Sequence, residues 1–134
     1  MSLKTWKKQY MPDAHNHVGR GIEAVEHSLK KWRGLLPANL KRHGMQHPVE
    51  WEDYNSVIRE IKHPITEDLI IDADNCALCF HHPYGCGSCP LKVTLGAACD
   101  RPGQPYDLWV TSGRVHPMIK ALERTLKRLK EREP

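Results

Sequence analysis

The stretch from Cys76 to Cys89, CALCFHHPYGCGSC, places two C-x-x-C pairs in one short segment and strongly constrains how the chain can fold. A C-x-x-C turn directs two sulfurs at one cation, and Zn²⁺ accepts four thiolates in a tetrahedron. Gly85 and Gly87 flank Cys86, as expected where a backbone bends sharply around a ligand. The spacing predicts a compact site that ties four cysteines to one metal ion.

The leading set of metal ligands consists of both C-x-x-C pairs, Cys76, Cys79, Cys86 and Cys89. Cys99 is a fifth thiol, and a set in which it replaces Cys86 or Cys89 is the main alternative. We expect His81 and His82 to stay off the metal, because thiolates outcompete imidazole at a closed zinc site. Four thiolates leave zinc no open position for water or substrate, so the site is predicted to be structural.

Zn²⁺ is the expected ion, but two other states of the cysteines stay open. A Cys-Pro step after closely spaced thiols, here at Cys89, is also found in iron-sulfur proteins, so an iron-sulfur cluster is the alternative cofactor. Disulfides or unliganded thiols are the remaining alternative. They are less expected in a reducing cytoplasm, where clustered cysteines more often hold metal.

Length and composition favour one globular domain over residues 1–134, with 40% hydrophobic and 27% charged residues. No apolar run approaches the ~18 residues that a membrane span requires. The start, MSLKTWKKQY, is basic but lacks the apolar segment of a signal peptide. We therefore expect a cytoplasmic protein with no membrane partner.

Charge is unevenly distributed, although the net charge is only +4. Residues 64–115, which hold the cysteines, carry three Lys/Arg against six Asp/Glu, whereas residues 116–134 carry six against three. Only Lys92 and Arg101 lie near the thiols in the sequence. Phosphate contacts supply most of the affinity of zinc modules for nucleic acid, so this pattern counts against the cysteine segment as a nucleic-acid reader.

Apolar spacing predicts a mainly α fold, a small single-domain helical protein with a Cys-rich metal-binding loop at 72–100. In the helical part at 21–63 we expect a helix from Ile22 to Arg33, stopped by Gly34, and a short one from Pro37 to Lys41.

A third helix is expected from about Val49 to Lys62, because Trp51, Tyr54, Ile58 and Ile61 recur at helical spacing. The apolar run at 69–71 is either a short strand or a buried turn.

The last expected helix spans 117–131. One face is an apolar stripe formed by Met118, Ile119, Leu122, Leu126 and Leu129. The other face is basic and includes Lys120, Arg124, Lys127 and Arg128. The simpler interpretation is a solvated helix face, and the alternative is a surface for nucleic acid or an acidic partner.

Trp32 shares a helical stripe with Val25 and Leu29, so we expect it in the core. On that basis His27, Lys30 and Lys31 are expected to be mostly exposed.

The sequence contains no convincing catalytic constellation. Cys99 and His116 could be paired as nucleophile and base, but nothing supplies a third group or an oxyanion site. Gly19-Arg20-Gly21 lacks the Lys and Ser/Thr of a phosphate loop. We therefore predict no enzymatic activity.

Several segments together resemble a family of small uncharacterised proteins encoded by bacteriophages and prophages. They are EHSLKKWRGLLPANLKRHG at 26–44, DADNCALC at 72–79, CGSCPL at 86–91, PYDLW at 105–109 and the PMIKALERTL segment that begins at Pro117. The resemblance covers about residues 23 to 129 and includes all five cysteines.

The resemblance implies a phage origin and action inside an infected bacterial cell, and it implies no particular activity. By analogy, the expected function is that of a non-enzymatic accessory protein that binds a host or phage protein. The first alternative is a nucleic-acid-binding zinc protein that uses the basic last helix. The second is an iron-sulfur redox protein. The partner and the oligomeric state stay open.

Overall fold

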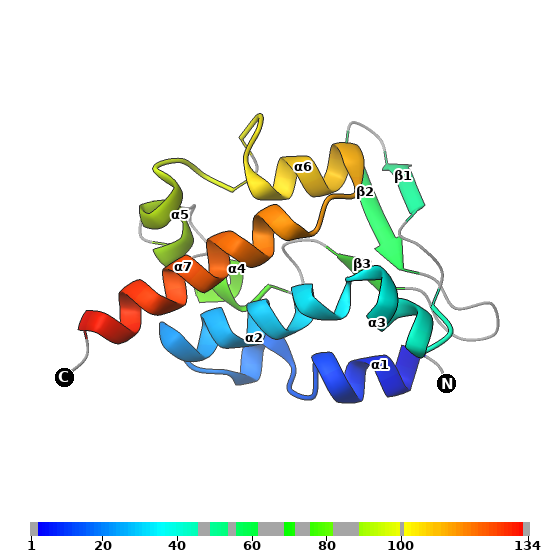
Figure 1. Ribbon diagram of the computed structural model, residues 1–134, viewed down its shortest axis with the longest axis horizontal. Coiled ribbons are helices and arrows are strands. Elements are labelled where there is room, and N and C mark those ends of the chain that lie inside the picture. Colours follow the sequence, from blue (N-terminus) through cyan, green and yellow to red (C-terminus); the bar gives the residue numbers. More distant parts are fainter. Residues whose placement is uncertain are drawn as a thin grey trace.

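The protein is mainly helical and forms one small domain (Figure 1). The computed structural model describes residues 3–45, 49–53, 56–61, 69–71, 76–81, 89–99 and 101–132; within 49–71 it describes the backbone alone. The elements are α1 (Leu3–Tyr10), η1 (His15–His17), α2 (Ile22–Gly34), α3 (Pro37–Arg42), β1 (Val49–Asp53), β2 (Ser56–Ile61), β3 (Leu69–Ile71), α4 (Ala77–His81), α5 (Pro90–Leu95), α6 (Pro105–Ser112) and α7 (His116–Arg132).

Helix α2 is the centre of the molecule, because it packs against α1, α3, α4 and α7. In Figure 1, α7 runs beside α2, and α1 lies on the opposite side of α2. Trp32 is 2% exposed and meets the fully buried Trp109 of α6 edge to face, with ring centroids 5.1 Å apart. The predicted helices at α2, α3 and α7 are confirmed, and so is the core position of Trp32.

Helix α1 is attached to the end of α2 through Gly34. The Trp6 indole N–H donates a 2.8 Å hydrogen bond to the Gly34 carbonyl, and the Tyr10 ring lies against Gly34. A Cβ atom at position 34 would lie 2.5 Å from Tyr10 Cγ. Gly34 was expected to stop the helix by its backbone conformation, but its role in the structure is to let α1 approach α2 closely.

The helix expected from Val49 to Lys62 is wrong, because β1 and β2 form an antiparallel pair there. The sequence also fits a strand, since Val49-Glu50-Trp51-Glu52 alternates apolar and charged residues and the segment is rich in β-branched residues. Trp51 and Ile58, which were expected to share a helix face, are instead directly opposed in the strand register.

The apolar run at 69–71 resolves as a strand, because β3 pairs with β2 and completes a three-stranded sheet of order β1-β2-β3. A third strand gives the hairpin the pairing partner that an isolated hairpin lacks. The sheet lies at one end of the molecule, where β2 contacts α6 (Figure 1).

The cysteine segment is less loop-like than expected, since α4 and α5 lie within 72–100. Both α5 and α6 begin with a proline in the first turn and are followed by a glycine with positive φ, Gly96 at 77° and Gly113 at 71°. That combination is a recognised start and stop signal for a helix. It puts Cys89 directly before the first turn of α5.

Candidate functional site

The first C-x-x-C pair lies at the beginning of α4, against the inner face of α2. Cys76 immediately precedes α4, and Cys79 lies inside it. The Cys76 thiol is hydrogen-bonded to the Cys79 side chain and to the backbone N–H groups of Leu78 and Cys79. This is the local arrangement that a C-x-x-C turn needs in order to present both sulfurs to one metal ion.

The surroundings of Cys76 favour its thiolate form. The pKa of Cys76 lies well below its usual range, chiefly because of the hydrogen bond with the Cys79 side chain, although burial acts in the opposite direction. The positive charge of Lys31 and the two backbone N–H groups lower this pKa further. A thiolate is the species that binds metal.

Helix α2 contributes two polar side chains to this region. Ser28 Oγ lies 3.9 Å from Cys76 Sγ, within the range of a hydrogen bond to sulfur. Lys31 is 1% exposed, so the expectation that it is mostly exposed is wrong. Lys30 is exposed as expected. The sequence pattern did not predict that Lys31 and Ser28 are buried. The apolar stripe through Trp32 indicates one buried face of the helix, but it does not show that a second helix packs next to that face.

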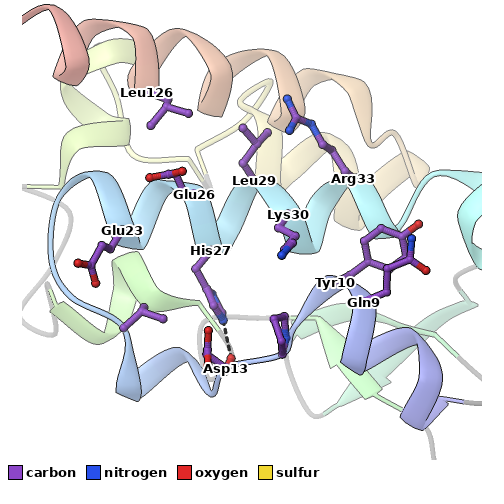
Figure 2. Close-up of a pocket in the computed structure, with 12 residues that line it drawn as sticks. Gln9, Tyr10, Asp13, Glu23, Glu26, His27, Leu29, Lys30, Arg33 and Leu126 are labelled. Carbon is purple, nitrogen blue, oxygen red and sulfur yellow. Dashed lines mark hydrogen bonds between the residues drawn. The ribbon is translucent and has the colours of Figure 1, made fainter.

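His27 was also expected to be mostly exposed, and it is 7% exposed. Its Nε2 is 2.8 Å from the Asp13 carbonyl oxygen, to which it donates a hydrogen bond (Figure 2). Burial lowers the pKa of His27, and the charge of Lys31 acts in the same direction. The hydrogen bond of His27 with Asp13 therefore fixes the segment between α1 and η1 to α2.

The other cysteines of the predicted site occupy separate elements. Cys89 is buried directly before α5, and Cys99 is half-buried and packs against the core. Cys86 and His82 lie outside the described residues. His81 Nε2 is 2.9 Å from the Val18 carbonyl oxygen. The four described cysteines form no disulfide with one another.

Among the described side chains, no three His, Cys, Asp or Glu groups lie close enough together to hold a metal ion. The described residues bring the thiols of Cys76 and Cys79 together. Every set of four ligands chosen from the five cysteines contains at least three of the four described ones, and no three of these lie together. Metal binding and its ligand set stay predictions.

The basic residues of α7 differ in their exposure, since some face solvent and one contacts another helix. Lys120, Arg124 and Lys127 are exposed. Arg128 is half-buried, and its Nη2 donates a 2.7 Å hydrogen bond to the Pro90 carbonyl oxygen at the start of α5. Arg128 therefore connects two helices, a role that its place in the basic pattern did not suggest.

A groove of about 610 Å³ runs along the outer side of α2 (Figure 2). Its apolar lining includes Tyr10, Leu29 and Leu126. The charged lining has both signs, and consists of Asp13, Glu23, Glu26, Lys30 and Arg33. A second hollow of about 460 Å³ shares Leu29, Arg33 and Leu126 with the groove and continues over α7. Sequence reasoning missed this groove, because α1, α2 and α7 create it together.

Comparison of the chain with family models, curated proteins and solved structures found no match. None of the helices within the described ranges has the length and apolar character needed to cross a bilayer.

Proposed function

We propose that this chain is a non-enzymatic accessory protein of a bacteriophage or prophage, which binds a host or phage protein in the bacterial cytoplasm. The groove along α2 is the proposed contact surface, and a structural Zn²⁺ ion held by cysteines is proposed to stabilise the fold. The phage setting is supported by the sequence resemblance alone.

The observation that carries this proposal is the composition of the groove. Protein interfaces combine a buried apolar centre, often aromatic, with a polar rim. Tyr10, Leu29 and Leu126 supply the apolar part, and Glu26, Lys30 and their neighbours supply a rim of both signs. A mixed rim suits a protein surface better than a polyanion, which needs an excess of Lys and Arg.

A charge-reversal pair tests the groove. Lys30→Glu changes an exposed residue of the groove lining, and Lys41→Glu makes the same change at an exposed position on α3 outside it. The immobilised protein is incubated with bacterial lysate, and captured proteins are identified by mass spectrometry. We expect one captured protein to be lost with Lys30→Glu and kept with Lys41→Glu. Equal capture by both variants would contradict the groove as the contact surface.

The zinc part of the proposal is supported by the paired thiols of Cys76 and Cys79 at the start of α4. Cys76, Cys79, Cys86 and Cys89 are the proposed ligands, with Cys99 as the alternative fourth. Zinc would join the segment around α4 to the start of α5, and because the site is closed it would supply no chemistry. An iron-sulfur cluster in the same site would colour the purified protein brown.

Nucleic-acid binding is a second candidate, favoured by the exposure of Lys120, Arg124 and Lys127 on one helix. Replacing these three residues by Gln removes three charges and leaves the Arg128 contact with Pro90 intact. If they contact phosphates, the salt dependence of DNA or RNA binding becomes less steep by about one unit of slope per lost contact. Absence of binding to DNA and RNA at low salt would rule this candidate out.

A further inference from the structure

The charges that α2 contributes to the groove are separated by sign. Figure 2 shows Glu23 and Glu26 toward one end of the groove, and Lys30 and Arg33 toward the other. All four side chains are exposed, and Asp13 adds a third carboxylate from the segment between α1 and η1. The stretch of α2 from Glu23 to Arg33 is about 15 Å long. The groove therefore has an acidic end and a basic end.

One charge at each end is available to a partner. Arg33 Nη2 lies 3.2 Å from Glu123 Oε2 of α7, so this cation is already paired within the fold. Glu26 and Lys30 are four residues apart, a spacing at which they could pair with each other. Neither of them forms an ion pair or a hydrogen bond with a described side chain. Glu26 and Lys30 thus present charges of opposite sign to the groove.

The apolar part of the groove comes from three helices. Leu29 of α2, Leu126 of α7 and Tyr10 of α1 form it. The lining consists of residues of these helices and of the segment 12–18, so it offers no strand edge to which an extended peptide could add. Such a lining suits the mode of recognition in which an amphipathic helix lays its apolar face into a groove.

We propose that the groove takes one amphipathic helix of a partner protein, whose apolar face is flanked by a basic residue at one end and an acidic residue at the other. The basic residue faces Glu23 and Glu26, the acidic residue faces Lys30, and the apolar face lies on Leu29 and Leu126. A uniformly charged segment is disfavoured, because it would bring like charges together at one end. The inference rests on the groove being the contact surface of the proposed function, and it adds the chemistry of the segment that binds there.

Three labelled peptides of about 20 residues, long enough to form a helix in isolation, test this chemistry. They share one Leu-rich apolar stripe and differ in the residues that flank it, which are Lys at one end and Glu at the other, Lys at both ends, or Glu at both ends. Binding to wild type is measured by fluorescence anisotropy at low salt. We expect the peptide with both signs to bind at least ~5-fold more tightly than either of the others, whichever direction it takes in the groove.

Charge variants of the groove should change the order of the peptides. Lys30→Glu leaves only negative unpaired charge along the groove, so the peptide with Lys at both ends should become the tightest binder. Glu26→Lys makes the opposite change, and the peptide with Glu at both ends should gain relative to the peptide with both signs. Lys41→Glu, on α3 outside the groove, should keep the wild-type order. All three substitutions are at exposed positions, where they should leave the fold intact.

Two results would overturn the inference. One is a failure of all three peptides to bind, and the other is an order of affinities that does not follow the flanking charges or that Lys30→Glu leaves unchanged. The capture experiment judges the proposed function separately. If Lys30→Glu loses a captured protein while the peptides show no dependence on charge, only this inference fails. If Lys30→Glu has no effect in either experiment, the groove itself fails as the contact surface.

Discussion

Lys30 and Lys31 illustrate how much the surroundings of one residue depend on its position around a helix. Lys30 lines the groove and faces solvent, while Lys31 is buried, with its Nζ 5.6 Å from the centre of the Trp32 ring. Trp32, the next residue, enters the core and meets Trp109. Of these three consecutive side chains of α2, one thus lines the groove and two are buried.

Trp32→Ala tests the core at this scale. Removing a large side chain that is 2% exposed leaves a cavity and deletes the edge-to-face contact with Trp109. We expect a loss of ~3 to 5 kcal/mol in the free energy of unfolding, measured by urea denaturation. Val93→Ala, at a position 58% exposed, is the control and should change stability by less than ~0.5 kcal/mol. A loss below ~1 kcal/mol for Trp32→Ala would mean that the indole is not packed in the core.

His43 connects α1 to the end of α3 and should make stability depend on pH. Its Nδ1 accepts a 2.9 Å hydrogen bond from the Thr5 hydroxyl, and its Nε2 donates a 2.7 Å bond to Gln9 Oε1. Burial lowers the pKa of His43 below the usual 6.5, and the charge of Arg42 lowers it further. The unfolded chain therefore binds a proton first as the pH falls, so this stabilisation is present above pH 6.5 and is lost as the pH drops toward the folded-state pKa.

The measurement compares the free energy of unfolding of wild type and His43→Gln from about pH 7 to pH 5. The difference between the two proteins isolates His43, because the contributions of His27 and of the other titratable groups are shared and cancel. We expect wild type to lose its advantage over His43→Gln as the solution becomes more acidic. A constant difference across this range would show that His43 has the same pKa in both states.

At the scale of elements, the sequence predicts those whose signals are local. The helices α2, α3 and α7 follow from apolar spacing bounded by Gly or Pro, and the structure confirms them. The segment 49–61 fits both a helical and an alternating apolar pattern. The strand conformation is stabilised by the pairing of β2 with β3, which lies further along the chain. The burial of Lys31 and Ser28 and the position of the groove depend on how the helices pack against one another. The spacing of residues along the chain does not predict that packing.

The contact between α1 and α2 is predicted to tolerate no side chain at position 34. Gly34→Ala places a Cβ atom 2.5 Å from Tyr10 Cγ, so α1 must shift away. Overpacking of this kind costs ~1 to 3 kcal/mol, although Ala is otherwise favoured over Gly inside a helix. Hydrogen exchange should increase in α1 and stay unchanged in α7.

A second substitution distinguishes this clash from a general weakening of α2. Tyr10→Ala removes the ring that the new methyl group would strike, so adding Gly34→Ala to Tyr10→Ala should cost less than adding it to wild type. If the two costs are equal, or if Gly34→Ala alone stabilises the protein, the close approach of α1 to Gly34 is not required.

At the scale of the whole molecule, α2 joins three parts that lie apart in the sequence. It carries α1 on one side and α7 on the other, and its inner face packs against α4, where the first cysteine pair lies. The proposed zinc site would link α4 to the start of α5, which in turn packs against α7. The metal would thereby hold together α2 and α7, two of the three helices that form the groove.

The most direct test of this account is the metal and thiol content of the purified, folded protein. Native mass spectrometry with elemental analysis gives the metal, and titration with a thiol reagent gives the number of accessible cysteines before and after chelation. We predict one Zn²⁺ per chain and one titratable thiol among the five cysteines, with all five titrating once the metal is removed. A metal-free protein, or disulfides among these cysteines, would contradict the account.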